Sequence, residues 1–145
     1  MNSPFKILGN EILWTAALAG WAGALFLLSS FSNVTPEPGI ELPHIDKVLH
    51  FSYFLIGGFI LATIICLKRG LSASFKTRIL LPFIIFAVFG ALDEYHQTFT
   101  PGRSGNDPFD WLADILGALC GIISANCLHP RLLKLSSPPP LISEN

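Results

Sequence analysis

The chain has 145 residues, of which 51% are hydrophobic and only 13% are charged, and its mean hydropathy is +0.56. A soluble domain usually carries about 25% charged residues, so this composition favours one membrane-embedded domain. The formal net charge of −1 and the lack of a basic cluster argue against a nucleic-acid partner. The three cysteines lie inside apolar runs and predict neither a disulfide framework nor a zinc site.

The first apolar segment covers residues 12–31 and contains no charged residue. A helix of this length reaches about 30 Å, the thickness of the hydrocarbon core of a bilayer. Residues 1–11 form a polar lead, in which Asn10 is placed to cap the helix. A cleavable signal peptide is the alternative interpretation, but the run is long for that purpose and Lys6 alone makes a weak positive region.

The second span is predicted over residues 48–67, after a proline-rich loop (residues 32–43) and with helical character from about Asp46. Residues 68–78 form a polar link.

The third apolar run, residues 79–92, is too short to cross a membrane unless the helix continues to Phe99, where Pro101 and Gly102 then end it. A third span over residues 80–99 therefore places Asp93 and Glu94 inside the helix.

The fourth span is predicted over residues 108–128. Asp107 is placed as the N-cap, Pro108 as the first helical residue, and Asp110 in the first turn. Residues 129–145 include three consecutive prolines and are expected to form a disordered tail. The predicted fold is all-α: an integral membrane bundle in which residues 12–128 form four transmembrane helices.

The charged residues are divided unequally between the two ends of this bundle. Seven of the nine cations fall on the side of the termini: Lys6, Lys68, Arg69, Lys76, Arg78, Arg131 and Lys134. Positive residues mark the cytoplasmic side, so both termini are predicted to lie in the cytoplasm. Lys47 and Arg103 are the two cations on the outer side, where eight of the ten acids gather.

Polar residues share helix faces near the outer ends of three spans. They are Asp46, Lys47 and His50 on the second span, Asp93, Glu94 and Gln97 on the third, and Asp110 and Asp114 on the fourth. Ionisable residues at membrane depth normally face a bundle interior or a wet cavity. The pattern therefore predicts one outward-opening polar vestibule. On the fourth span the stripe continues through Gly117 and Gly121, a spacing that lets a neighbouring helix approach closely.

Some of these polar residues can be explained by a structural role alone. Asp107 and Asp110 are largely accounted for by helix capping, and Asp46 by its position near a helix start. Arg103 follows a Pro-Gly turn, where it could pair with an acid. His50, Glu94 and Asp114 have no such explanation, because Asp114 lies far past any cap. These three are the candidate catalytic residues.

The motifs together resemble the VanZ-like family of small bacterial membrane proteins, named after a teicoplanin-resistance protein. The matching residues are Lys47, His50, Asp93, Glu94, Gln97, Arg103, Asp110 and Asp114, over roughly residues 46–121. Family members commonly have asparagine where this chain has Asp114, which is a departure. The resemblance implies a multi-pass protein of the bacterial inner membrane and a cell-envelope context, including antibiotic resistance. It supplies no agreed reaction, and the cofactor is unknown.

The favoured function is the binding or processing of an anionic lipid or a lipid-linked cell-wall intermediate. Lys47 and Arg103 would hold a phosphate, and His50 and Glu94 would serve as acid and base. The remaining candidate binding residues are Gln97, Asp93, Asp110 and Asp46.

Three alternatives stay open. A divalent metal site has suitable ligands in His50, Glu94, Asp93 and either Asp110 or Asp114, although their spacing is not diagnostic. A proton or cation conduit lacks acidic residues in the inner halves of the spans. A non-catalytic membrane module would use the polar cluster to fix helix register or to dock a partner. The sequence decides neither catalysis nor oligomeric state.

Overall fold

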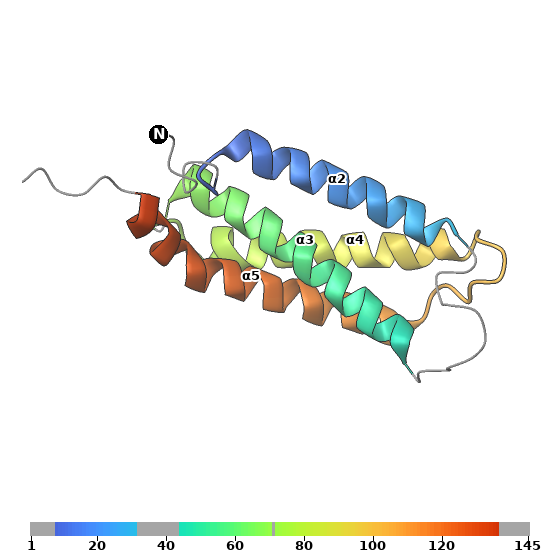
Figure 1. The fold of residues 1–145 in the computed structure, drawn as a ribbon. Coiled ribbons are helices and arrows are strands. Elements are labelled where there is room, and N and C mark those ends of the chain that lie inside the picture. The colour runs from blue at the N-terminus through green and yellow to red at the C-terminus, as the bar shows by residue number, and fades with distance from the viewer. Residues whose placement is uncertain (1–7, 32–43, 71, 137–145) are drawn as a thin grey trace, which may run out of the picture.

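The computed structural model describes residues 8–31, 44–70 and 72–136, and its ribbon is shown in Figure 1. The described elements are α2 (Glu11–Ser29), α3 (Ile45–Arg69), the π-helix η1 (Lys76–Leu80), α4 (Leu81–Gln97) and α5 (Pro108–Ser136). Four helical stretches are long and apolar enough to cross a membrane: Glu11–Ser29, Ile45–Arg69, Lys76–Gln97 and Pro108–Pro130. They run alternately up and down, so α2 begins and α5 ends at the same end of the bundle (Figure 1). The predicted all-α, four-helix membrane fold is confirmed.

Local capping chemistry fixes two of the helix starts. The Asn10 side chain accepts hydrogen bonds from the backbone N–H groups of Ile12 (3.0 Å) and Leu13 (3.4 Å), which have no partner within the helix. Asp107 Oδ1 accepts from the N–H of Phe109 at 2.8 Å, at the start of α5. Both predicted caps are therefore confirmed.

The third span begins earlier than the sequence analysis placed it. Lys76 and Arg78, assigned there to the polar link, belong to η1, which leads directly into α4. A π-helix does not follow the ordinary α-helical hydrogen-bond ladder. Here Asn126 of α5 supports it: its Nδ2 donates to the Arg78 carbonyl (3.3 Å), and Arg78 Nε donates to Asn126 Oδ1 (2.7 Å). A side chain from another helix thus stabilises this irregular start.

Two other boundaries also differ from the prediction. Helix α4 ends at Gln97 rather than residue 99, because the N–H groups of Thr98 and Phe99 turn back to the carbonyls of Tyr95 and His96. Helix α5 continues past residue 128 to Ser136, with Pro130 inside it. The predicted loop at residues 32–43 and the end of the predicted tail, residues 137–145, lie outside the described residues.

Helices α3 and α5 form the most closely packed pair in the bundle. Gly117 lies against the backbone carbonyl of Phe51, and Gly121 lies against the backbone of Leu55 and Phe59. A methyl group at either glycine would collide with the α3 backbone. The predicted close approach of a neighbouring helix is therefore confirmed. This contact fixes the register in which α3 and α5 present their polar residues.

Helix α2 is attached mainly through one aromatic residue. Trp21 packs edge-on against Phe54 and Phe86, with ring centroids 5.8 and 5.3 Å apart. Its Nε1–H donates to the carbonyl of Tyr53 at 2.9 Å. The buried residues of α2 are spaced four apart on one face: Trp21, Leu25 and Ser29. The rest of α2 is largely exposed, so this helix packs against the other three helices through one face only.

Candidate functional site

The structure brings all nine predicted site residues to one end of the bundle, where α3 and α5 begin and α4 ends. Five of them are buried: Asp93, Glu94, Gln97, Asp110 and Asp114. His50 and Lys47 are partly buried on α3, Arg103 is partly buried in the loop before α5, and Asp46 is exposed. Buried carboxylates are costly in an apolar bundle unless they are paired, so the partners of each group decide what the site can do.

His50 lies between two buried carboxylates. Its Nδ1 is 2.9 Å from Asp114 Oδ1 and 3.8 Å from Glu94 Oε1. Asp114 is fully buried, with its other oxygen against Gly90 of α4, so it holds the imidazole in one orientation. A carboxylate on one ring nitrogen fixes the tautomer and leaves the other nitrogen for proton transfer or ligand binding.

Lys47 connects the start of α3 to the start of α5. Its ammonium group lies 3.1 Å from Asp46, 3.0 Å from Asp107 and 2.9 Å from Asp110. Three carboxylates occupy the three donors of the ammonium group, so Lys47 has no N–H left for a phosphate in this arrangement. The pKa of Asp107 lies below its ordinary value, because the Phe109 backbone N–H and the Lys47 ammonium both stabilise the charged carboxylate.

A second chain of hydrogen bonds joins the loop, α4 and α2. Arg103 donates from Nε (3.1 Å) and Nη2 (2.8 Å) to Gln97 Oε1, and Gln97 Nε2 donates to Asp93 Oδ2 at 2.9 Å. Ser29 of α2 donates to the other oxygen of Asp93. Within the described ranges, Arg103 has no carboxylate partner, since Gln97 is neutral. No carboxylate among the residues with described positions therefore offsets the positive charge of Arg103.

Among the described residues, only one of the two carboxylate oxygens of Glu94 has a hydrogen-bond partner. Its Oε2 accepts from the backbone N–H of Asp107 at 2.8 Å, which ties α4 to the start of α5. Among the residues that the structure describes, Glu94 Oε1 and Asp114 Oδ2 are shielded from solvent and lack a hydrogen-bond partner. Buried polar atoms without partners are rare in folded proteins, so each such atom points to a missing ligand, ion or proton.

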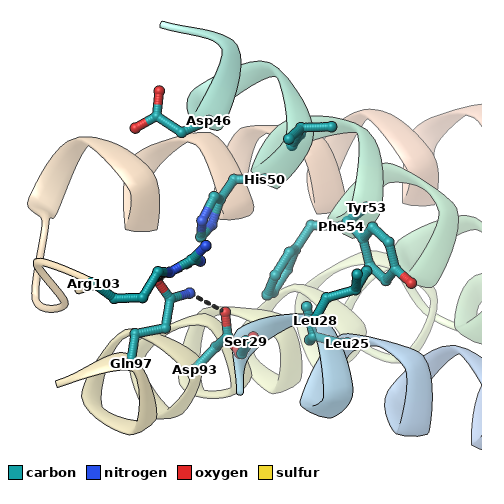
Figure 2. Close-up of a pocket in the computed structure, with 11 residues that line it drawn as sticks. Leu25, Leu28, Ser29, Asp46, His50, Tyr53, Phe54, Asp93, Gln97 and Arg103 are labelled. Atoms are coloured by element: carbon teal, nitrogen blue, oxygen red, sulfur yellow. Dashed lines mark hydrogen bonds between the residues drawn. The ribbon is translucent and has the colours of Figure 1, made fainter. Parts of the chain in front are cut away.

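A pocket opens beside this network, between α2, α3 and α4. Its polar lining consists of Ser29, Asp46, His50, Asp93, Gln97 and Arg103, and its apolar lining of Leu25, Leu28, Leu49, Tyr53 and Phe54. Figure 2 shows Asp46, His50, Gln97 and Arg103 toward one side of the pocket, and Tyr53, Phe54, Leu25 and Leu28 toward the other. One end of the pocket can bind a charged or polar group and the other an apolar chain.

Sequence reasoning missed the contribution of α2 to this pocket. Ser29 was given no role in the sequence analysis, yet it is buried and bound to Asp93. Its backbone carbonyl also accepts from Thr100 Oγ1 at 2.9 Å, which fixes the loop after α4. Ser29 shares a helix face with Leu25 and Trp21, but the sequence of a largely apolar helix does not specify which face is buried.

A protein-family model described as VanZ/LLP1 matches residues 3–129 of the chain. The chain belongs to the VanZ/LLP1 family. The match covers all four membrane helices, so it confirms the family resemblance of residues 46–121 and extends it to α2. With four apolar helices, the chain is a multi-pass VanZ-like membrane protein. No curated protein and no solved structure matches it.

Proposed function

We propose that this VanZ/LLP1 protein binds the anionic head group of a membrane lipid, or of a lipid-linked envelope intermediate, in the pocket between α2, α3 and α4. The observation that carries the proposal is the division of the pocket lining. Polar residues on its outer side adjoin an apolar side made by Leu25, Leu28 and Phe54. A lipid has the same division between head group and acyl chain, and an envelope lipid fits the cell-envelope context of the family.

Arg103 is the residue that would select an anionic head group. Two of its five N–H donors bind the neutral Gln97 side chain, and the other three bind no group in the described part of the chain, so they can serve a ligand. Its planar guanidinium suits the bidentate binding of phosphate oxygens. We therefore assign to Arg103 alone the phosphate contact that the sequence divided between Arg103 and Lys47, because Lys47 is engaged by three carboxylates.

His50 is the residue that we propose for proton transfer if the bound lipid is processed. It lines the pocket, and Asp114 fixes its ring from the buried side. A histidine oriented by a carboxylate is the usual arrangement of a general base. Gln97 and Asp93 position Arg103 through the hydrogen bonds described above. The proposed anion binding thus comes from the loop before α5 and the proposed proton transfer from α3.

The proposed orientation places the pocket at the outer face of a bacterial cytoplasmic membrane. Lys68, Arg69, Lys76 and Arg78 belong to the end of α3 and the start of the third span, opposite the pocket. The distribution of these cations supports a cytoplasmic location for that end. The acyl chain of a bound lipid would then extend inward from the outer leaflet.

Native mass spectrometry of detergent-purified protein tests the lipid proposal. An anionic phospholipid added to the protein should be retained, and Arg103→Ala should weaken its binding at least about tenfold, since hydrogen bonds to charged groups contribute about 1.5–3 kcal/mol. Arg69→Ala is the matched control, because Arg69 is an exposed cation at the opposite end of α3. If both variants retain the lipid as the wild type does, the proposed anion site is wrong.

A further inference from the structure

His50, which lines the pocket, converges with Glu94 and Asp110. One ligand atom from each, a ring nitrogen and two carboxylate oxygens, lies within 4.8 Å of the others. The three residues come from α3, α4 and α5, so the packing of three helices builds the cluster. Two ligands of one ion are at most about 4.4 Å apart when each bond is about 2.2 Å, so a small side-chain movement would close the cluster around an ion.

Among the described residues, neither Glu94 nor Asp114 forms a salt bridge with a lysine or an arginine. Lys47 pairs with Asp46, Asp107 and one oxygen of Asp110, but no salt bridge in the described part of the chain joins it to Glu94 or Asp114. Glu94 and Asp114 are 4% and 0% exposed, and the only basic side chain that contacts them among the described residues is His50. One imidazole offsets at most one of the two negative charges, in a place where unpaired charge is costly.

Glu94 Oε1 gives an independent indication of a missing ligand. It is shielded from solvent and, among the residues with described positions, has no hydrogen-bond partner. Its carboxyl group cannot simply turn away, because Oε2 is held by the backbone N–H of Asp107 at 2.8 Å. The free oxygen therefore stays on the side of His50, 3.8 Å from Nδ1.

We propose that His50, Glu94 and Asp110 bind one divalent metal ion. The mixed imidazole and carboxylate ligands favour Mn²⁺ or Zn²⁺ over Mg²⁺ and Ca²⁺, which prefer oxygen ligands alone. Asp114, 2.9 Å from His50 Nδ1, orients the imidazole and leaves Nε2 as the nitrogen for the ion, as carboxylates commonly do for metal-binding histidines. Lys47 holds the second oxygen of Asp110 and thereby fixes that carboxylate.

The metal site goes beyond the lipid proposal and does not depend on it, because Arg103 is not a ligand. The ion would lie beside His50, which lines the pocket. A phosphate held by Arg103 would then have a Lewis acid next to it, which is a common arrangement in enzymes that act on phosphate esters.

Metal analysis of purified protein tests the site. Wild-type protein, stripped with a chelator and then incubated with Mn²⁺ or Zn²⁺ and desalted, should retain about one equivalent, and its melting temperature should rise with metal concentration. Glu94→Gln should weaken binding at least about tenfold. Glu11→Gln is the control: Glu11 is an exposed carboxylate in the first turn of α2, at the opposite end of the bundle, so this variant should bind as the wild type does.

The outcomes separate the two proposals. If the wild type retains far less than one equivalent of either ion and shows no shift in melting temperature, the metal site is wrong, whatever the lipid result. Equal metal binding by wild type and Glu94→Gln would also overturn it. Arg103→Ala should lose the lipid and still bind the metal ion. Metal binding can therefore be measured and interpreted even if the lipid proposal fails.

Discussion

His50 on α3 and Asp114 on α5 are in hydrogen-bond contact, 2.9 Å apart, just before the turn at which Gly117 lets the two helix backbones touch. The same close packing that makes α3 and α5 one rigid pair therefore buries Asp114 and aims His50 at the pocket. The packing of α3 on α5 and the positions of His50 and Asp114 therefore depend on each other, and substitutions at these residues can measure the contribution of each.

Replacing Asp114 tests whether its carboxylate matters as an acceptor or as a charge. Asp114→Ala removes the acceptor for His50 Nδ1 and should destabilise the protein by about 1–3 kcal/mol, the cost of an unsatisfied buried group. Asp114→Asn keeps an acceptor oxygen and should remain close to the wild type. Thermal unfolding in detergent measures both. Equal stability of the two variants would show that the contact with His50 contributes nothing to the fold.

The α3–α5 contact should not tolerate a larger residue. Gly117→Val places a side chain against the Phe51 carbonyl and should cost about 1–3 kcal/mol, because the helices must separate. Gly23→Ala on α2 is the control, since nothing lies within 4 Å of that position and alanine favours a helix. A melting temperature for Gly117→Val equal to that of the wild type would contradict the packing described here.

Lys47 should contribute stability, with no direct part in anion binding. Lys47→Gln removes the cation shared by Asp46, Asp107 and Asp110, and should cost about 1–3 kcal/mol, less than a fully buried pair because Lys47 is 27% exposed. Lys68→Gln, at an exposed position, should have little effect on stability. Denaturation curves of the two variants in the same detergent test this difference. Loss of lipid binding in Lys47→Gln at unchanged stability would instead favour a direct contact with the head group.

The proposed orientation can be tested by cysteine labelling in intact cells. Ser104 is exposed in the loop before α5, and Ser72 is exposed between α3 and η1. In a variant without the three native cysteines, a membrane-impermeant thiol reagent should label Ser104→Cys and spare Ser72→Cys. Labelling of Ser72→Cys alone would place the pocket on the cytoplasmic side.

Features that depend on a few neighbouring residues were predictable from the sequence. The caps at Asn10 and Asp107 follow from local chemistry, and the burial of Asp93 and Glu94 follows from the length that a crossing helix requires. The convergence of the polar residues was also predicted, because helices that alternate in direction bring the second, third and fourth spans together at one end.

Features that depend on the packing of different helices were not predictable. Lys47 was expected to bind a ligand, but the register between α3 and α5 places Asp107 and Asp110 around it. The role of Ser29 depends on the face that α2 turns toward α4, which a largely apolar helix does not specify. The early start of the third span depends on Asn126, which lies 48 residues from Arg78 in the chain.

Photo-crosslinking with an anionic phospholipid that carries a diazirine in its acyl chain tests the central claim most directly. Peptide mapping should find crosslinks at Leu25, Leu28 and Phe54, which line the pocket, and Arg103→Ala should reduce them while crosslinks to exposed positions such as Ile56 and Val88 stay unchanged. Crosslinks confined to the exposed positions, with no effect of Arg103→Ala, would contradict a lipid-binding pocket.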